Sequence, residues 1–242
     1  MQSLEAELEQ ARALAVADLA DAIESIGFEC TRCGACCKGT GEDEHTATVF
    51  PDEVRELERT GGLDGEDDTD GASDWRDVAR PMPYGLRETA DGNREGETFE
   101  WALQTDGCGD CVFYEEDESG TGACVAHDDR PLICRTYPFS VALAGTSQPM
   151  GEAVDSVALP AQREAGDEEG LVRVHECEGL GRDISREDAE ELAAALKERA
   201  VRELEEAIGV RDTYAPADPD PGEVVVHDSE GAKGIDGTPI DE

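Results

Sequence analysis

Lysine is nearly absent from this 242-residue sequence, which contains only Lys38, Lys197 and Lys233. Acidic residues number 60 against 20 basic ones, so the formal net charge is -40. A phosphate backbone is bound by patches of Lys and Arg, and this balance argues against a nucleic-acid partner. The acids are spread along nearly the whole chain. We therefore favour adaptation to a salt-rich cytoplasm, as in halophilic archaea, over an acidic interaction tail, because salt screens the self-repulsion of a strongly charged protein.

Long apolar runs are also missing. No stretch of about 18 apolar residues occurs, so we expect no membrane partner and no membrane span. The first 27 residues contain acids where a secretory signal needs an uninterrupted apolar segment, and we expect a cytoplasmic protein. A reducing cytosol disfavours structural disulfides, and nine cysteines would leave one unpaired in any all-disulfide scheme. Clustered thiols in such a chain indicate metal ligation or redox chemistry.

Apolar periodicity predicts one amphipathic helix near each end of the chain. The first covers residues 3–26 and ends at Gly27, and the second covers 186–208, with Ser185 as its cap and Gly209 as its stop. Between them lie short segments of strand composition, at 98–103, 111–114, 123–126 and 171–177.

These elements predict an α+β fold. We expect a small, irregular, cysteine-rich domain that is centred on metal, contains short strands and is flanked by the N- and C-terminal amphipathic helices. The expected divisions are an N-terminal helix at 1–27, a cysteine-cluster metal-binding domain at 28–184, a C-terminal helix packed on it at 185–209, and a flexible acidic tail at 210–242.

The densest motif is CTRCGACC, which places Cys30, Cys33, Cys36 and Cys37 within eight positions. Iron–sulfur clusters use a C-x-x-C-x-x-C run with a fourth ligand from elsewhere, whereas zinc uses C-x-x-C pairs. The run favours iron, although it lacks the Cys-Pro dipeptide of bacterial ferredoxins. Neighbouring cysteines cannot both easily face one tetrahedral ion. Either Cys36 or Cys37 therefore binds a second metal or is a spare thiol.

Five further cysteines follow at wider spacing: Cys108, Cys111, Cys124, Cys134 and Cys177. The segment around Cys134, DDRPLICRTYPFSV, is stiffened by two prolines.

Residues around that segment are candidates for the surroundings of a thiolate site. Arg130 and Arg135 can hydrogen-bond a thiolate or a cluster sulfur, and Tyr137 can shield the site from water. Residues 30–41 and 130–151 contain no acidic residue. A site made of several thiolates is negatively charged, and carboxylates nearby would oppose it. Burial of both stretches is the alternative explanation.

The sequence resembles the YkgJ-like cysteine-cluster family, to which zinc or iron chelation is ascribed. The resemblance rests on CTRCGACC, the step CVFY at 111–114, the run GACVAHDDRPLICRTYPF and the late CEGLG, over residues 28 to about 184. It implies a ligand set, with Cys108 as an addition. The implied ligands are Cys30, Cys33, Cys36, Cys37, Cys111, Cys124, Cys134 and Cys177.

Two of the four histidines are further candidate ligands. His127 and His175 lie near the ligand candidates Cys124 and Cys177 in the sequence, and histidine is a common metal ligand. We expect His45 and His227 to face solvent.

Three functions follow from these patterns. The first is a cytosolic metal-binding protein that holds an iron–sulfur cluster (4Fe–4S favoured) or iron, with a role in electron transfer or metal handling. The second is a zinc-binding structural or interaction module. The third is a cluster-dependent enzyme such as a methyl-transfer protein, because the cysteine pattern distantly resembles that of flagellin lysine methylases. Eight ligands make either two four-ligand sites or one cluster with spare thiols, and the sequence leaves this open.

Overall fold

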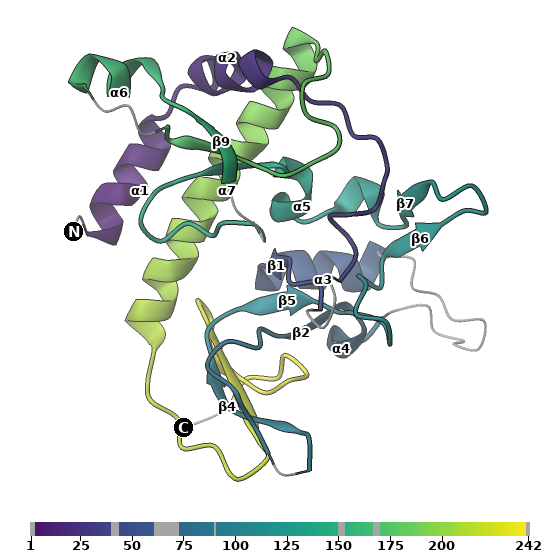
Figure 1. Ribbon diagram of the computed structural model, residues 1–242. Helices are drawn as coiled ribbons and strands as arrows, with labels where there is room; N and C mark the ends of the chain where they lie inside the picture. The colour runs from purple at the N-terminus through teal and green to yellow at the C-terminus, as the bar shows by residue number, and fades with distance from the viewer. Residues whose placement is uncertain are drawn as a thin grey trace. The chain divides into compact units, whose positions relative to one another are not determined.

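The computed structural model describes residues 3–39, 44–60, 73–89, 91–149, 153–166 and 170–240. Short helices alternate with short strands in small sheets, which confirms the predicted α+β class (Figure 1). The chain divides into two compact units, each built from two stretches of sequence. Unit 1 is Met1–Cys36 with Leu132–Ala207, and unit 2 is Cys37–Pro131 with Ile208–Glu242.

Unit 1 begins with two helices where the sequence predicted one. Helix α1 (Leu4–Ala13) ends at Leu14, and α2 (Val16–Ile26) begins after Ala15, whose backbone is extended. Neither a proline nor a glycine marks this break in the sequence. The break lets each helix bury its own apolar face, and Leu19 and Ile23 of α2 are fully buried.

The sheet of unit 1 has the order β8-β10-β9 and is antiparallel throughout. Strands β8 (Phe139–Val141) and β10 (Val172–His175) contribute fully buried side chains, while β9 (Ala153–Val157) forms an edge. In the sequence, helix α5 (Leu132–Thr136) precedes β8, and α6 (Pro160–Ala165) lies between β9 and β10. The predicted strand at 171–177 is confirmed.

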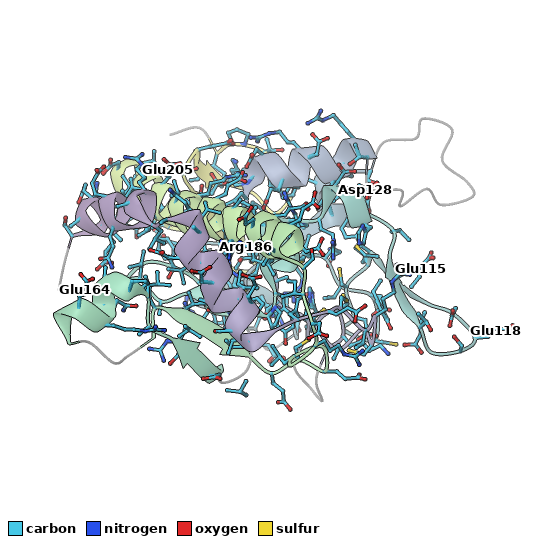
Figure 2. All side chains as sticks on the ribbon, turned by 90° about the horizontal axis from the view of Figure 1, so that it is seen from above. Glu115, Glu118, Asp128, Glu164, Arg186 and Glu205 are labelled. Atoms are coloured by element: carbon cyan, nitrogen blue, oxygen red, sulfur yellow. The ribbon has the colours of Figure 1, made fainter. Side chains whose placement is uncertain are left out.

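Helix α7 (Arg186–Thr213) is the longest element and anchors unit 1 through charged groups at both its surface and its core. Near its start, Arg186 contacts the carboxylates of Asp21 and Glu24 at 2.5 Å each, which ties α7 to α2 (Figure 2). Such exposed pairs each contribute little to stability, about 0–1 kcal/mol.

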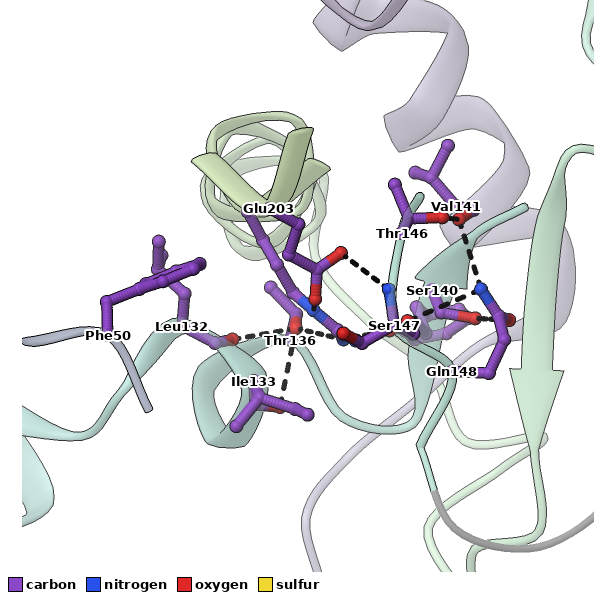
Figure 3. A network of polar contacts seen from close by, with 12 residues as sticks. Phe50, Leu132, Ile133, Thr136, Ser140, Val141, Thr146, Ser147, Gln148 and Glu203 are labelled. Carbon is purple, nitrogen blue, oxygen red and sulfur yellow. Dashed lines mark hydrogen bonds and ion pairs between the residues drawn. The ribbon is translucent and has the colours of Figure 1, made fainter. Parts of the chain in front are cut away.

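The buried part of α7 carries an ion pair between Arg199 and Glu203, with Nε to Oε1 at 2.9 Å. Both residues are more than nine-tenths buried. The guanidinium also donates to Thr136 Oγ1 at 3.0 Å and to the Ser147 carbonyl at 2.8 Å, and the Ser147 amide donates to Glu203 (Figure 3). The pair thereby connects α7 to α5 and to the loop after β8.

Unit 2 is built on three small sheets, with orders β1-β5-β2, β12-β11-β4-β3 and β6-β7. Among its described residues are the helices α3 (Pro51–Thr60) and α4 (Trp75–Val78), the 3-10 helix η1 (His127–Asp129) and the end of α7. The strands are β1 (Thr48–Val49), β2 (Ala79–Pro81), β3 (Arg87–Glu88), β4 (Arg94–Thr98), β5 (Trp101–Leu103), β6 (Tyr114–Glu116), β7 (Gly122–Cys124), β11 (Val224–Asp228) and β12 (Gly231–Lys233).

Strands β11 and β12 lie within residues 210–242, for which the sequence predicted a flexible acidic tail. Strand β11 pairs in parallel with β4 and antiparallel with β12, and Val225 and Val226 are buried. Lys233 is buried against Asp228, with Nζ to Oδ2 at 2.8 Å, and Trp101 Nε1 donates to the same carboxylate at 2.9 Å. Apolar pairing and a satisfied buried charge therefore fix residues 224–233, although Pro, Asp and Gly precede them.

Acidic side chains project outward from many elements, as the labelled Glu115, Glu118, Asp128 and Glu164 show (Figure 2). In the described ranges, none of the helices combines the length and apolar character that a membrane crossing requires.

Candidate metal centre

A short antiparallel contact brings the start and the end of the cysteine pattern together in unit 1. The Glu29 amide donates to the Gly179 carbonyl at 3.1 Å, and the Gly181 amide donates to the Gly27 carbonyl at 3.0 Å. Phe28 and Leu180 form the bridge between these bonds. Cys30 therefore follows one strand of the contact directly, and Cys177 precedes the other.

Two glycines allow this close approach. A Cβ atom on Gly179 would lie 2.3 Å from the Glu29 carbonyl oxygen, and one on Gly27 would lie 2.3 Å from the Arg182 carbonyl oxygen. Gly27 also has a φ of 76°, in the region that favours glycine. The CEGLG segment thus provides both the Cys177 thiol and a glycine that lets its backbone pack closely against the Glu29 backbone.

Cys177 lies close enough to Cys30, Cys33 and Cys36 for their charges to act on its thiol. Burial is the main cause that raises the pKa of the Cys177 thiol. The Gly179 amide, 3.4 Å from the Cys177 sulfur, lowers this pKa by a hydrogen bond. The charges on Cys36, Cys33 and Cys30 raise it further. Like charges that gather in this way disfavour each other until a cation neutralises them. We call these four residues the unit 1 cysteine group.

Tyr137 lies beside the same group. Burial, followed by the charges on Cys177, Cys36 and Cys33, raises the pKa of Tyr137 to about 12. Its hydroxyl donates to the Glu176 carbonyl, next to Cys177 in the chain. The neutral phenol therefore persists at physiological pH.

The loop that carries the first three thiols contains two left-handed backbone conformations. Gly34 has a φ of 74°, and Arg32 has a φ of 58°, which is uncommon for a residue with a side chain. Such conformations turn the chain tightly between successive thiols. Cys30 and Cys36 are exposed, while Cys33 and Cys177 are half-buried.

The remaining cysteines are distributed over both units. Cys134 is half-buried on α5 in unit 1. Cys37, Cys108, Cys111 and Cys124 belong to unit 2, so the boundary between the units falls within the Cys36–Cys37 dipeptide.

The side chains do not yet form a closed metal site. Over the described ranges, which include every cysteine, no three His, Cys, Asp or Glu side chains are arranged to hold a metal ion. The structure thus brings the unit 1 thiols into one neighbourhood without arranging them as a coordination shell.

The two arginines expected near the thiols make different contacts. Arg130 donates from Nε to the His127 carbonyl at 3.0 Å, within its own turn, and the Arg135 side chain is exposed. Both remain candidates only by sequence.

The histidines also depart from expectation in part. His127 is exposed beside Asp128, whereas His175 is buried and its Nε2 lies 3.0 Å from the Ser140 hydroxyl. The expectation that His45 and His227 face solvent is wrong, because both are buried. His227 contacts Glu97 at 2.9 Å and stacks on Phe99. These residues are about 130 positions from His227, so no local sequence pattern predicts the contacts.

Comparison with known proteins settles the family. A family model named CxxCxxCC, described as "Putative zinc- or iron-chelating domain", matches residues 29–178. The chain belongs to the CxxCxxCC family. Neither a search of curated proteins nor a search of solved structures found a match. The family supports zinc or iron binding in general and does not choose between the two metals.

Proposed function

We propose that the protein holds an iron–sulfur cluster, with 4Fe–4S favoured, at the unit 1 cysteine group, and that it serves in electron transfer or metal handling. The observation that carries this proposal is the backbone contact of Phe28 with Leu180, which brings Cys30, the first thiol of the C-x-x-C-x-x-C run, beside the distant Cys177. Three closely spaced thiols with one distant partner are the ligand pattern of such clusters.

The surroundings of the group suit a bound cluster. The Gly179 amide points at the Cys177 sulfur, and hydrogen bonds to sulfur are among the features that set a cluster's reduction potential. Tyr137 and the edge-to-face pair of Phe28 and Phe139, with ring centroids 5.9 Å apart, cover part of the neighbourhood. A bound cluster would supply one-electron chemistry, and these residues would orient and shield it.

The exposure of two thiols supports a role in exchange over a purely structural one. Cys30 and Cys36 reach solvent, so a redox partner or an iron donor can approach the group directly. A structural zinc site is usually closed by its four ligands. Zinc remains the alternative, because Cys30-x-x-Cys33 also has the spacing of a zinc pair and the family is described for either metal.

Anaerobic purification in high salt, followed by metal and labile-sulfide analysis and an absorption spectrum, tests the proposal. We expect a coloured protein with iron and sulfide in matching amounts. A colourless protein with stoichiometric zinc and no sulfide would overturn the iron–sulfur assignment.

The ligand assignment is tested by a pair of serine variants. Cys33→Ser removes the central thiol of the run and should abolish iron and sulfide loading. Cys108→Ser, which alters an exposed thiol in the other unit, should leave both at the wild-type level. Equal losses in the two variants would contradict the ligand assignment.

A further inference from the structure

Arg80 is a buried cation on β2 of unit 2, and its side chain is more than nine-tenths enclosed. Its Nη2 atom donates to the His45 carbonyl at 2.6 Å, which holds the guanidinium in place. Among the described residues, the buried Nε and Nη1 atoms of Arg80 have no hydrogen-bond partner. Burial is the main cause that lowers the pKa of Arg80, yet an arginine stays charged at physiological pH. A buried charge with unused donors is costly until oxygen atoms reach those donors.

A second arginine approaches the same place from another sheet of unit 2. Arg94 is the first residue of β4, in the sheet β12-β11-β4-β3, whereas Arg80 belongs to the sheet β1-β5-β2. Nη1 of Arg80 and Nη2 of Arg94 lie 3.4 and 3.5 Å from one carboxylate oxygen, Oε2 of Glu44. Both distances are longer than the about 2.7–2.9 Å of a charge-assisted hydrogen bond. The Glu44 carboxylate therefore lies between two guanidinium groups without satisfying either of them.

This cluster has the opposite sign of charge to the molecule as a whole. Two guanidinium groups face one carboxylate, which leaves an excess of positive charge, in a chain with a formal net charge of -40. So strong a negative charge repels dissolved anions from most of the surface. An anion that binds to this protein therefore requires a local group of donors, and Arg80 with Arg94 provides one.

We infer that Arg80 and Arg94 form a binding site for a phosphate group, free or in an ester, and that the Glu44 carboxylate occupies this site in competition with it. A carboxylate has one negative charge and two oxygens in one plane. A phosphate group carries about -1.5 to -2 charges at pH 7 and has at least three acceptor oxygens. It can therefore accept hydrogen bonds from each arginine through a different oxygen and neutralise both guanidinium groups.

The site is accessible from the side of Glu44 and Arg94. Their side chains are 42% and 46% exposed, whereas that of Arg80 is 9% exposed. Ion pairs of exposed side chains contribute little to stability, so the Glu44 carboxylate can exchange its place for water at little cost. A phosphate group that enters from this side reaches the unused Nη1 donor of Arg80 and contacts Arg94 at the rim.

Calorimetric titration of the full-length protein with inorganic phosphate, at an ionic strength held constant with potassium chloride, tests the site. We expect saturable binding. Arg94→Gln alters a half-exposed side chain and should weaken binding roughly tenfold or more, as loss of a hydrogen bond between charged groups does. Glu44→Gln should tighten binding, because it removes the competing charge. Absence of saturable phosphate binding from both the wild-type and the Glu44→Gln protein overturns the inference.

Glu118→Gln is the matched control for net charge, since Glu118 is exposed between β6 and β7 of the same unit (Figure 2). Its phosphate affinity should equal that of the wild type. Equal tightening in Glu118→Gln and Glu44→Gln would mean that overall charge sets the affinity, and would contradict competition by Glu44. Acetate at the same ionic strength should bind more weakly than phosphate, and equal affinity for the two anions would contradict the assignment to a phosphate group.

Glycerol phosphate distinguishes the two sources of the group, because one of its phosphate oxygens is esterified. Similar affinity for this ester and for inorganic phosphate identifies the phosphate group of an ester as a ligand, and binding of inorganic phosphate alone identifies free phosphate. Arg80→Met should abolish binding of either, and wild-type affinity in folded Arg80→Met protein, checked by circular dichroism, contradicts the site. None of the nine thiols takes part, so these results are independent of the iron–sulfur proposal.

Discussion

Gly179 controls how closely the two ends of the cysteine pattern approach within unit 1. Its lack of a side chain allows the Glu29 carbonyl to lie where a Cβ atom would otherwise stand. The hydrogen bond between these two residues then holds Cys30 and Cys177 on adjacent backbones. The glycine therefore serves the site although it has no ligand atom of its own.

Gly179→Ala should push the two backbones apart, cost about 1–3 kcal/mol in the free energy of unfolding, as overpacking does, and lower metal loading of the unit 1 group. Denaturant unfolding and metal analysis measure the two effects. Gly107→Ala is the control, since a Cβ atom there meets nothing within 4 Å. Wild-type stability and loading in Gly179→Ala would show that the contact does not support the site.

At this scale the sequence predicted the thiols and missed what surrounds them. The spacing of CTRCGACC could be interpreted because thiol chemistry depends on few residues. The pairing of Phe28 with Leu180 joins residues about 150 positions apart, and no local pattern predicts such a register. The glycines of CEGLG were the only signal, since glycine in a short motif often marks a close backbone approach.

Helix α7 is longer than the sequence predicted, and it buries charged residues that the sequence does not mark as buried. Its periodicity predicted a helix over 186–208, with Gly209 as the stop, but the helix continues to Thr213. A Cβ atom on Gly209 would lie 2.5 Å from that of Ser229, so this glycine permits close packing inside unit 2. The same element buries Arg199 and Glu203, which a sequence pattern assigns to a solvated face.

Arg199→Met should destabilise the protein by about 3–5 kcal/mol, because it leaves Glu203 buried without its ion-pair partner. The double variant Arg199→Met with Glu203→Leu should recover most of this loss, since an apolar pair of similar volume often replaces a buried ion pair without cost. Denaturant titration of both proteins measures the difference. Equal losses in the single and double variants would mean that lost packing, and not the unpaired carboxylate, sets the effect.

The whole molecule is dominated by its negative charge. Sixty acidic residues on a chain of this length repel one another in the compact state, and the described ion pairs neutralise only some of them. Ionic strength shortens the range of this repulsion from about 10 Å at 0.1 M salt to about 3 Å at 1 M. The division into two units, each assembled from sequence-distant stretches, was not predictable, because composition changes little at Cys37 or Ala207.

We expect the free energy of unfolding to rise as the potassium chloride concentration increases from about 0.1 to 1 M, because the added salt screens the repulsion between acidic residues. Thermal or denaturant unfolding at several salt concentrations measures the trend. Sucrose at matched osmolality is the control, since it stabilises compact states without screening charge. A flat or falling dependence on salt would contradict a stability limited by self-repulsion.

The scarcity of lysine gives the buried Lys233 a practical use. Its ammonium is almost fully enclosed by Asp228, Glu230 and the Trp75 ring, whereas Lys38 and Lys197 are partly accessible. An amine-acylating reagent would therefore modify those two side chains in the folded chain and Lys233 only after the β11-β12 hairpin opens. Because the chain has so few lysines, the acylation of Lys233 can be followed separately, and its rate would report how often the β11-β12 hairpin opens.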